Sequence, residues 1–168
     1  IEIGLRHIET VCIDSVHERV RCLTAWLIEN LLSLRHSNGE ALVALYGPAD
    51  THMRGGTIAL NFYDPDGHLF KLEVVEAQAS ERRLSLRTGC FCNPGASENA
   101  LGYTGEDLAE YFHLDERMTI EQFAVAMAGK NKEAVGAVRV SVGIVTNFAD
   151  VYRFMQFAEG FLDRPANA

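Results

Sequence analysis

The chain has 168 residues, 48% of them hydrophobic, and a mean hydropathy of -0.01, which is the composition of an ordinary globular protein with one substantial core. Its formal net charge of -8 argues against a nucleic-acid or anionic-membrane surface, because such surfaces need clustered Lys and Arg. No apolar run approaches the roughly 20 residues that cross a bilayer, and no signal-peptide pattern opens the chain. We therefore expect a cytoplasmic protein with protein or small-molecule partners.

The first 67 residues predict one helix and two strands. Residues 16–34 carry apolar side chains at three- and four-residue spacings, which places them on one face of an amphipathic helix. Asn38-Gly39 supplies a helix stop signal. The apolar run 41–46 and the alternating run 56–63 both indicate strands, and the second ends in the turn sequence 64–67.

A second helix and a third strand are predicted before the cysteine motif. Residues 69–82 show helical spacing, and residues 83–88 alternate as a strand that leads into the motif RTGCFCNPGAS at 87–97. A motif at a strand end lies on a loop that the sheet holds firmly. Beyond it, Thr104 and Thr119 begin capping spacings that indicate two short helices.

The last predicted elements are a strand over 137–143 and a helix that begins at Asn147, with Asp150 three residues later. The tail 163–168 is expected to fray. Helices therefore separate most of the strands along the chain. This order predicts a single α+β domain over residues 1–168, an α/β sandwich with a sheet of about four strands.

Cys90 and Cys92 stand one residue apart, just before the turn-forming run 93–95. A closed zinc site needs four ligands, and neither a second close cysteine pair nor a suitably spaced histidine pair is present. A disulfide between them would close a small, strained ring, and most of the four cysteines are expected to be reduced. Two interpretations stay open: buried small side chains, or a working thiol near the charge of Arg87.

Arg139 lies inside an apolar alternating strand. Ala137, Arg139 and Ser141 therefore share one face, and the valines between them share the other. Arg139 is either a solvent-facing side chain on the wet face of a sheet or a guanidinium held for bidentate binding of a carboxylate.

Two other features receive structural interpretations. The run RGGT at 54–57 precedes a strand rather than a helix, so we interpret it as a close-approach turn and not as a phosphate loop. The six histidines, including His17, His36 and His113, are expected at the surface.

The run LRTGCFCNPGA at 86–96, followed by GAVRVSVGIVTNFADVYRFMQF at 136–157, resembles the C-terminal end of class V aminotransferase-fold enzymes. These enzymes depend on pyridoxal phosphate. Within the group, the chain is most similar to molybdenum cofactor sulfurases, and more distantly to cysteine desulfurases and selenocysteine lyases. The runs ALVALYGP, RGGTIALNF and DPDGH follow the family's order, so the resemblance covers nearly the whole chain. Ser97 stands where the sulfurase pattern often has another cysteine.

The resemblance implies a small C-terminal domain of a fold-type I transferase and assigns roles to five residues. Cys92 would take the substrate's sulfur as a persulfide, with Cys90 as an auxiliary thiol and Asn93 shaping the loop. Arg139 would hold the substrate α-carboxylate, and Arg87 would line the same cleft. Pyridoxal phosphate would be the cofactor, and the full-length protein would be a homodimer; no metal is implied.

The chain has three lysines, Lys71, Lys130 and Lys132, and none has the strand-end setting that pyridoxal phosphate requires. We therefore expect the cofactor-binding large domain to lie outside this chain, and the chain alone to be inactive. The leading hypothesis is a cysteine desulfurase or molybdenum cofactor sulfurase-like domain. The alternatives are a noncatalytic persulfide carrier or interaction module, and a class V transaminase or lyase in which Cys92 is incidental. The sequence fixes neither the substrate, cysteine or selenocysteine, nor the final sulfur acceptor.

Overall fold

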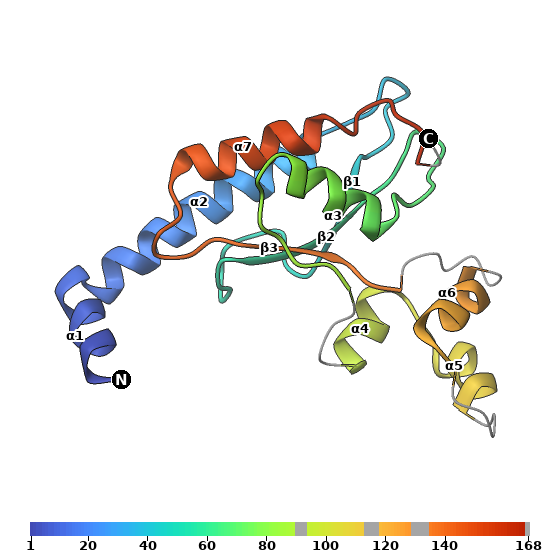
Figure 1. Cartoon of the computed structure of the whole chain (residues 1–168), viewed down its shortest axis with the longest axis horizontal. Helices are drawn as coiled ribbons and strands as arrows, with labels where there is room; N and C mark the ends of the chain where they lie inside the picture. The colour runs from blue at the N-terminus through green and yellow to red at the C-terminus, as the bar shows by residue number, and fades with distance from the viewer. Residues whose placement is uncertain (90–93, 113–117, 129–134, 167–168) are drawn as a thin grey trace.

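A computed structural model describes residues 1–89, 94–112, 118–128 and 135–166. Its elements in chain order are α1 (Glu2–Val11), α2 (Ile13–Ser33), β1 (Val43–Tyr46), β2 (Thr57–Phe62), α3 (Leu72–Glu81), α4 (Pro94–Ala100), α5 (Gly105–Phe112), α6 (Ile120–Ala128), β3 (Val138–Ser141) and α7 (Phe148–Glu159) (Figure 1). The described part is an α+β domain, as the sequence predicts. Its sheet has three strands among the described residues, instead of the four predicted.

The sheet is antiparallel, with the strand order β1-β2-β3. Val43 pairs with Phe62, and Ile58 pairs with Val140, so the alternation of a strand places apolar side chains on one face. Helices α2, α3 and α7 lie on one side of the sheet, and α4, α5 and α6 lie on the other (Figure 1). The buried core lies between the apolar face of the sheet and helices α2, α3 and α7. It includes Leu27, Leu31, Ile58, Leu60, Phe62, Val75, Val138, Val151, Phe154 and Phe157.

The C-terminal tail is anchored, so the expectation that it frays is wrong up to residue 166. The Phe62 ring stacks on the Phe161 ring with centroids 4.9 Å apart. Farther on, the buried Ala166 donates its N–H to the Asp64 carboxylate at 3.0 Å. Asp64 also accepts from the N–H groups of Asp66 and His68, which fixes the predicted turn at 64–67.

The predicted strand over 83–88 is wrong. Arg83 has φ 57°, in the left-handed region that few side chains adopt, and the segment begins in a turn after α3. It contributes one isolated bridge, between Arg87 and Arg139. Pro94 and Gly95, predicted as part of a turn, instead begin α4; proline suits a first helical turn, where its missing N–H needs no partner.

Three predicted helix starts are confirmed by their hydrogen bonds. Asn147 accepts from the N–H of Asp150, and the Asp150 carboxylate accepts from the N–H of Asn147, which completes a capping box at α7. Equivalent reciprocal bonds join Thr104 to Asp107 before α5 and Thr119 to Gln122 before α6. The capping residues therefore predict helix starts well in this chain.

The close-approach turn is confirmed, whereas the surface location of His36 is wrong. A Cβ placed on Gly56 would lie 2.8 Å from the Val20 side chain and overlap the Val142 carbonyl. His36 is 3% exposed. Its Nδ1 accepts from the N–H of Asp163 at 3.0 Å, so its Nε2 carries the proton and donates to the Tyr63 carbonyl at 2.9 Å.

Helix α2 begins earlier than predicted and follows directly on α1. Cys12, between them, has φ 73°, so the two helices are separate (Figure 1). α2 ends at Ser33, before the predicted stop signal at Asn38-Gly39. No described helix is long and apolar enough to span a membrane.

Candidate functional site at the edge of the sheet

Arg87 and Arg139, here called the arginine pair, are backbone partners at the edge of the sheet. The N–H of Arg87 donates to the carbonyl of Arg139 at 3.1 Å, and the N–H of Arg139 donates back at 2.7 Å. Directly opposite residues of an antiparallel pair point to the same face, with Cβ atoms about 5 Å apart. Both side chains are exposed, and no described residue forms a salt bridge with either. Two arginine side chains thus leave the same face of the sheet from directly opposite positions.

The arginine pair lies on the face of the sheet opposite the apolar core. Along β3, Val138 is buried and Val140 is half-buried, whereas Arg139 and Ser141 are exposed. The predicted alternation of this strand is therefore confirmed. Across the sheet, Arg139 pairs with Ala59, a small side chain on β2.

Two glycines let the segment before Cys90 lie against β3. A Cβ on Gly136 would lie 2.6 Å from the carbonyl oxygen of Gly89, which is closer than packed atoms allow. Gly89 itself has φ 115°, a conformation open mainly to glycine. The N–H of Ala137 donates to that same Gly89 carbonyl at 2.9 Å. The opening of the cysteine motif is therefore tied to the strand that carries Arg139.

Asn61 is a buried polar residue beside this contact, and the sequence interpretation missed it. Its Nδ2 donates to the Gly136 carbonyl at 2.9 Å and to the Tyr46 hydroxyl at 3.0 Å. An amide inside the alternating run 56–63, on the same face as Thr57 and Ala59, was the signal in the sequence.

The Tyr46 hydroxyl also lies 3.4 Å from the Tyr63 hydroxyl. Burial and this contact raise the pKa of Tyr46 well above its usual value, so its phenol stays protonated at neutral pH. Tyr46 therefore remains a neutral hydrogen-bonding partner for Asn61.

The structure does not place every residue that the sequence assigns to the site. Cys90, Cys92 and Asn93 lie outside the described residues. The last described residues before them are held on two sides: Thr88 donates to Glu76 of α3 at 2.6 Å, and Gly89 bonds to Ala137. The structure therefore brings together Arg87, Arg139 and the start of the cysteine motif.

No protein-family model matches the chain, but its sequence is similar to that of named proteins. A molybdenum cofactor sulfurase of Solanum lycopersicum is 35% identical over 162 residues, which cover 95% of this chain and 19% of that protein. The molybdenum cofactor sulfurase of Arabidopsis thaliana is 32% identical over 161 residues, 92% of this chain and 19% of that protein. Molybdenum cofactor sulfurase 3 of Aedes aegypti is 33% identical over 159 residues, which cover 93% of this chain and 20% of that protein.

The chain is homologous to part of the molybdenum cofactor sulfurases. It spans about a fifth of the length of the curated relatives that it matches, 19% of each of the first two. The similarity extends over nearly all of this chain.

The described residues of this chain do not fit pyridoxal phosphate. Lys71, the lysine among them, is exposed at the N-terminal end of α3. A lysine that binds this cofactor needs an enclosed setting with an acidic partner and a phosphate cup. The arginine pair offers positive charge but no covalent attachment point.

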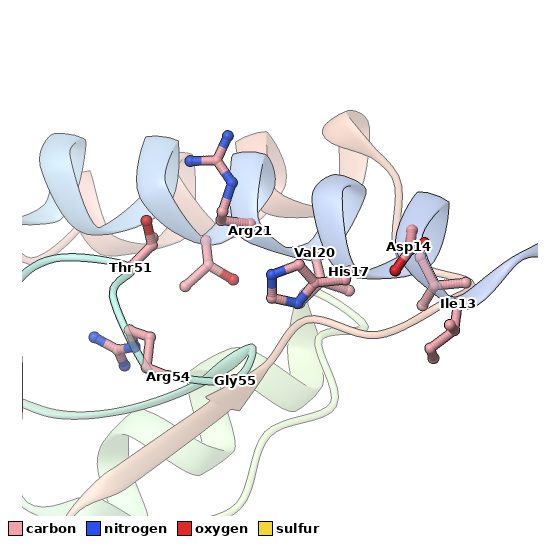
Figure 2. A pocket seen from close by; sticks show the side chains of 10 residues that line it. Ile13, Asp14, His17, Val20, Arg21, Thr51, Arg54 and Gly55 are labelled. Atoms are coloured by element: carbon pink, nitrogen blue, oxygen red, sulfur yellow. The ribbon is translucent and has the colours of Figure 1, made fainter.

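A separate groove runs between α2 and the loop before β2. Its lining includes Ile13, Asp14, His17, Val20, Arg21, Thr51, Arg54 and Gly55 (Figure 2). The Arg54 guanidinium donates to the carbonyls of Pro48 and Thr57. Arg21 donates twice to Glu18, and its guanidinium points away from the loop (Figure 2). Because both cations bind the protein itself, the groove is a weaker candidate for anion binding than the arginine pair.

Proposed function

We propose that this chain is the small C-terminal domain of a longer, pyridoxal-phosphate-dependent class V enzyme. Within that class it would be a sulfurtransferase of the molybdenum cofactor sulfurase or cysteine desulfurase type. The homology to named sulfurases supports the sulfur-transfer class. The observation that carries the proposal is the position of Arg139 directly beside Arg87, the first residue of the cysteine motif.

The arginine pair suits a substrate carboxylate. A guanidinium binds a carboxylate through two parallel N–H donors, and a second guanidinium beside it adds attraction for the same anion. Both backbones are fixed by reciprocal hydrogen bonds, so little main-chain freedom is lost when the substrate binds. Arg139 is assigned the carboxylate grip, and Arg87 lines the same cleft.

Cys92 is assigned the role of sulfur acceptor. In the net transfer, the Cys92 thiol and free cysteine give a Cys92 persulfide and alanine. A C–S bond of the substrate breaks, an S–S bond forms, and the substrate carbon takes up a proton. Cys90 is assigned the role of an auxiliary thiol, and Asn93 shapes the loop. Pyridoxal phosphate would be held by a large domain outside this chain, in a homodimeric enzyme, and would supply the activation of the substrate.

The experiment compares Cys92→Ser with Cys90→Ser in the full-length protein that contains this chain. Sulfide release from cysteine, measured with a reducing agent present, should fall to background in Cys92→Ser and persist in Cys90→Ser. Full activity of Cys92→Ser would mean that the thiol is incidental, as in a transaminase or lyase. A full-length protein that accepts sulfur from the persulfide of a donor enzyme, but never from free cysteine, would instead be a carrier.

A further inference from the structure

Asn61 occupies the centre of the sheet with its side chain removed from solvent. It is 0% exposed, and asparagine is rarely buried unless hydrogen bonds satisfy its amide. The Gly136 carbonyl can only accept a hydrogen bond, so the Asn61 nitrogen, at 2.9 Å, must face it. This bond fixes the orientation of the amide.

The peptide between Gly136 and Ala137 links Asn61 to the opening of the cysteine motif. Its carbonyl accepts from Asn61, and its N–H donates to the Gly89 carbonyl at 2.9 Å. The carbonyl and the N–H of a trans peptide point in opposite directions, so Asn61 and Gly89 hold this peptide from its two sides. Hydrogen bonds that share a peptide strengthen one another. Loss of the Asn61 bond should therefore loosen Gly89.

The oxygen of the Asn61 amide indicates that the bond to Gly136 determines the orientation of the side chain. Its Oδ1 is buried and has no hydrogen-bond partner among the residues that the structure describes. Reversing the amide would let Oδ1 accept from the Tyr46 hydroxyl but would set an oxygen against the Gly136 carbonyl. The side chain therefore keeps the Gly136 bond even though its own acceptor stays unpaired.

We infer that Asn61 is a positioning residue for the segment 87–89, which opens the cysteine motif. It fixes the peptide that holds Gly89 and thereby keeps Arg87 in register with Arg139, one bridge farther along β3. Asn61 lies on the same face of the sheet as Arg139 but is buried there, so it acts through this peptide. The inference deepens the proposed function, and only its kinetic test depends on that function.

Amide hydrogen exchange on this chain tests the structural part. Asn61→Asp keeps the shape of the side chain but replaces its N–H donors with an acceptor. Exchange at the amides of Arg87, Ala137 and Arg139 should then accelerate about 10-fold, which corresponds to the loss of one hydrogen bond. The amide of Tyr63, on the other edge of β2, should keep its wild-type exchange rate.

Two matched variants separate positioning from general packing. Tyr46→Phe removes the second acceptor of the Asn61 amide together with the contact to the Tyr63 hydroxyl. Thr57→Val removes a polar contact with Ser141 from the same face of β2. Both should leave exchange around Ala137 at the wild-type rate. Equal acceleration in all three variants, or uniform acceleration over the whole sheet, would overturn the inference.

The kinetic test uses the full-length protein with cysteine as substrate. Displacement of the arginine pair in Asn61→Asp should raise KM about 10-fold, because ground-state binding of the carboxylate is weakened. A mere loss of folded enzyme would lower kcat and leave KM unchanged, and that result would contradict a positioning role. If the wild type does not use cysteine, the proposed function fails, whereas the exchange result still decides the role of Asn61.

Discussion

Arg87 and Arg139 exchange both of their backbone hydrogen bonds, at 3.1 and 2.7 Å, although they come from separate segments of the chain. This pairing places two like charges next to each other on an exposed face. Like charges directly opposite each other in a sheet are destabilising, and a bound carboxylate would relieve their repulsion. The pair is therefore a candidate anion-binding feature of the exposed face.

Removal of the Arg139 guanidinium should weaken substrate binding in the full-length enzyme. Arg139→Ala is expected to lower kcat/KM for cysteine by about 10- to 100-fold, mostly through KM, because a charge-assisted hydrogen bond contributes about 1.5–3 kcal/mol. Arg139→Lys keeps the charge without the planar fork and should recover only part of the loss. Arg21→Ala, on the far side of the sheet, is the control for net charge. An unchanged KM in Arg139→Ala would contradict the carboxylate role.

The contact between Gly136 and Gly89 predicts a strong effect of one methyl group. In Gly136→Ala, the new Cβ would lie 2.6 Å from the Gly89 carbonyl oxygen, and relief of this overlap should lower the free energy of unfolding by about 1–3 kcal/mol. Gly143→Ala places its Cβ in open space and is the matched control. Urea unfolding of the two variants checks the difference; equal stabilities would show that segment 87–89 does not pack as described.

Acid should remove the contribution of Asp64 to stability. Burial alone would raise the pKa of Asp64, but the N–H donors of Ala166, His68 and Asp66 outweigh it and hold this pKa below the usual 3.8. Its stabilising effect is therefore present above pH 3.8 and is lost as the pH falls through the lower, folded-state pKa.

The test is Asp64→Asn, followed by urea unfolding across this pH range. At neutral pH the variant should be less stable than wild type by about 1–3 kcal/mol, and the gap should narrow below pH 3.8. Asp66→Asn, in the same turn but exposed, should leave the pH dependence close to that of wild type. If the difference in the free energy of unfolding between Asp64→Asn and wild type stayed constant down to strong acid, the ionised carboxylate would not be the source of that difference.

Local patterns predict most of the fold, because periodicity and capping depend on neighbouring residues. The helix around 16–34, the strands β1 and β2 and the Asn147 cap follow from such patterns. The segment 83–88 alternates like a strand, yet the left-handed conformation of Arg83 and the single bridge at Arg87 are set by tertiary packing.

In the candidate site, too, some features follow from local patterns and others from tertiary packing. The exposed face of Arg139 follows from alternation along its strand. Its juxtaposition with Arg87 does not, because register between segments distant in sequence is not encoded locally. Asn61 was missed because a polar residue in a strand is as consistent with a wet face as with a buried hydrogen-bond network.

The central claim is that this domain carries sulfur on Cys92, and peptide mapping by mass spectrometry tests it most directly. The full-length protein would be incubated with cysteine and pyridoxal phosphate, its persulfides trapped by alkylation, and its peptides mapped. We expect one additional sulfur atom on Cys92 in the wild type and a marked reduction of this label in Arg139→Ala. Sulfur found on Cys90 or another cysteine but never on Cys92, with sulfide release intact, would contradict it.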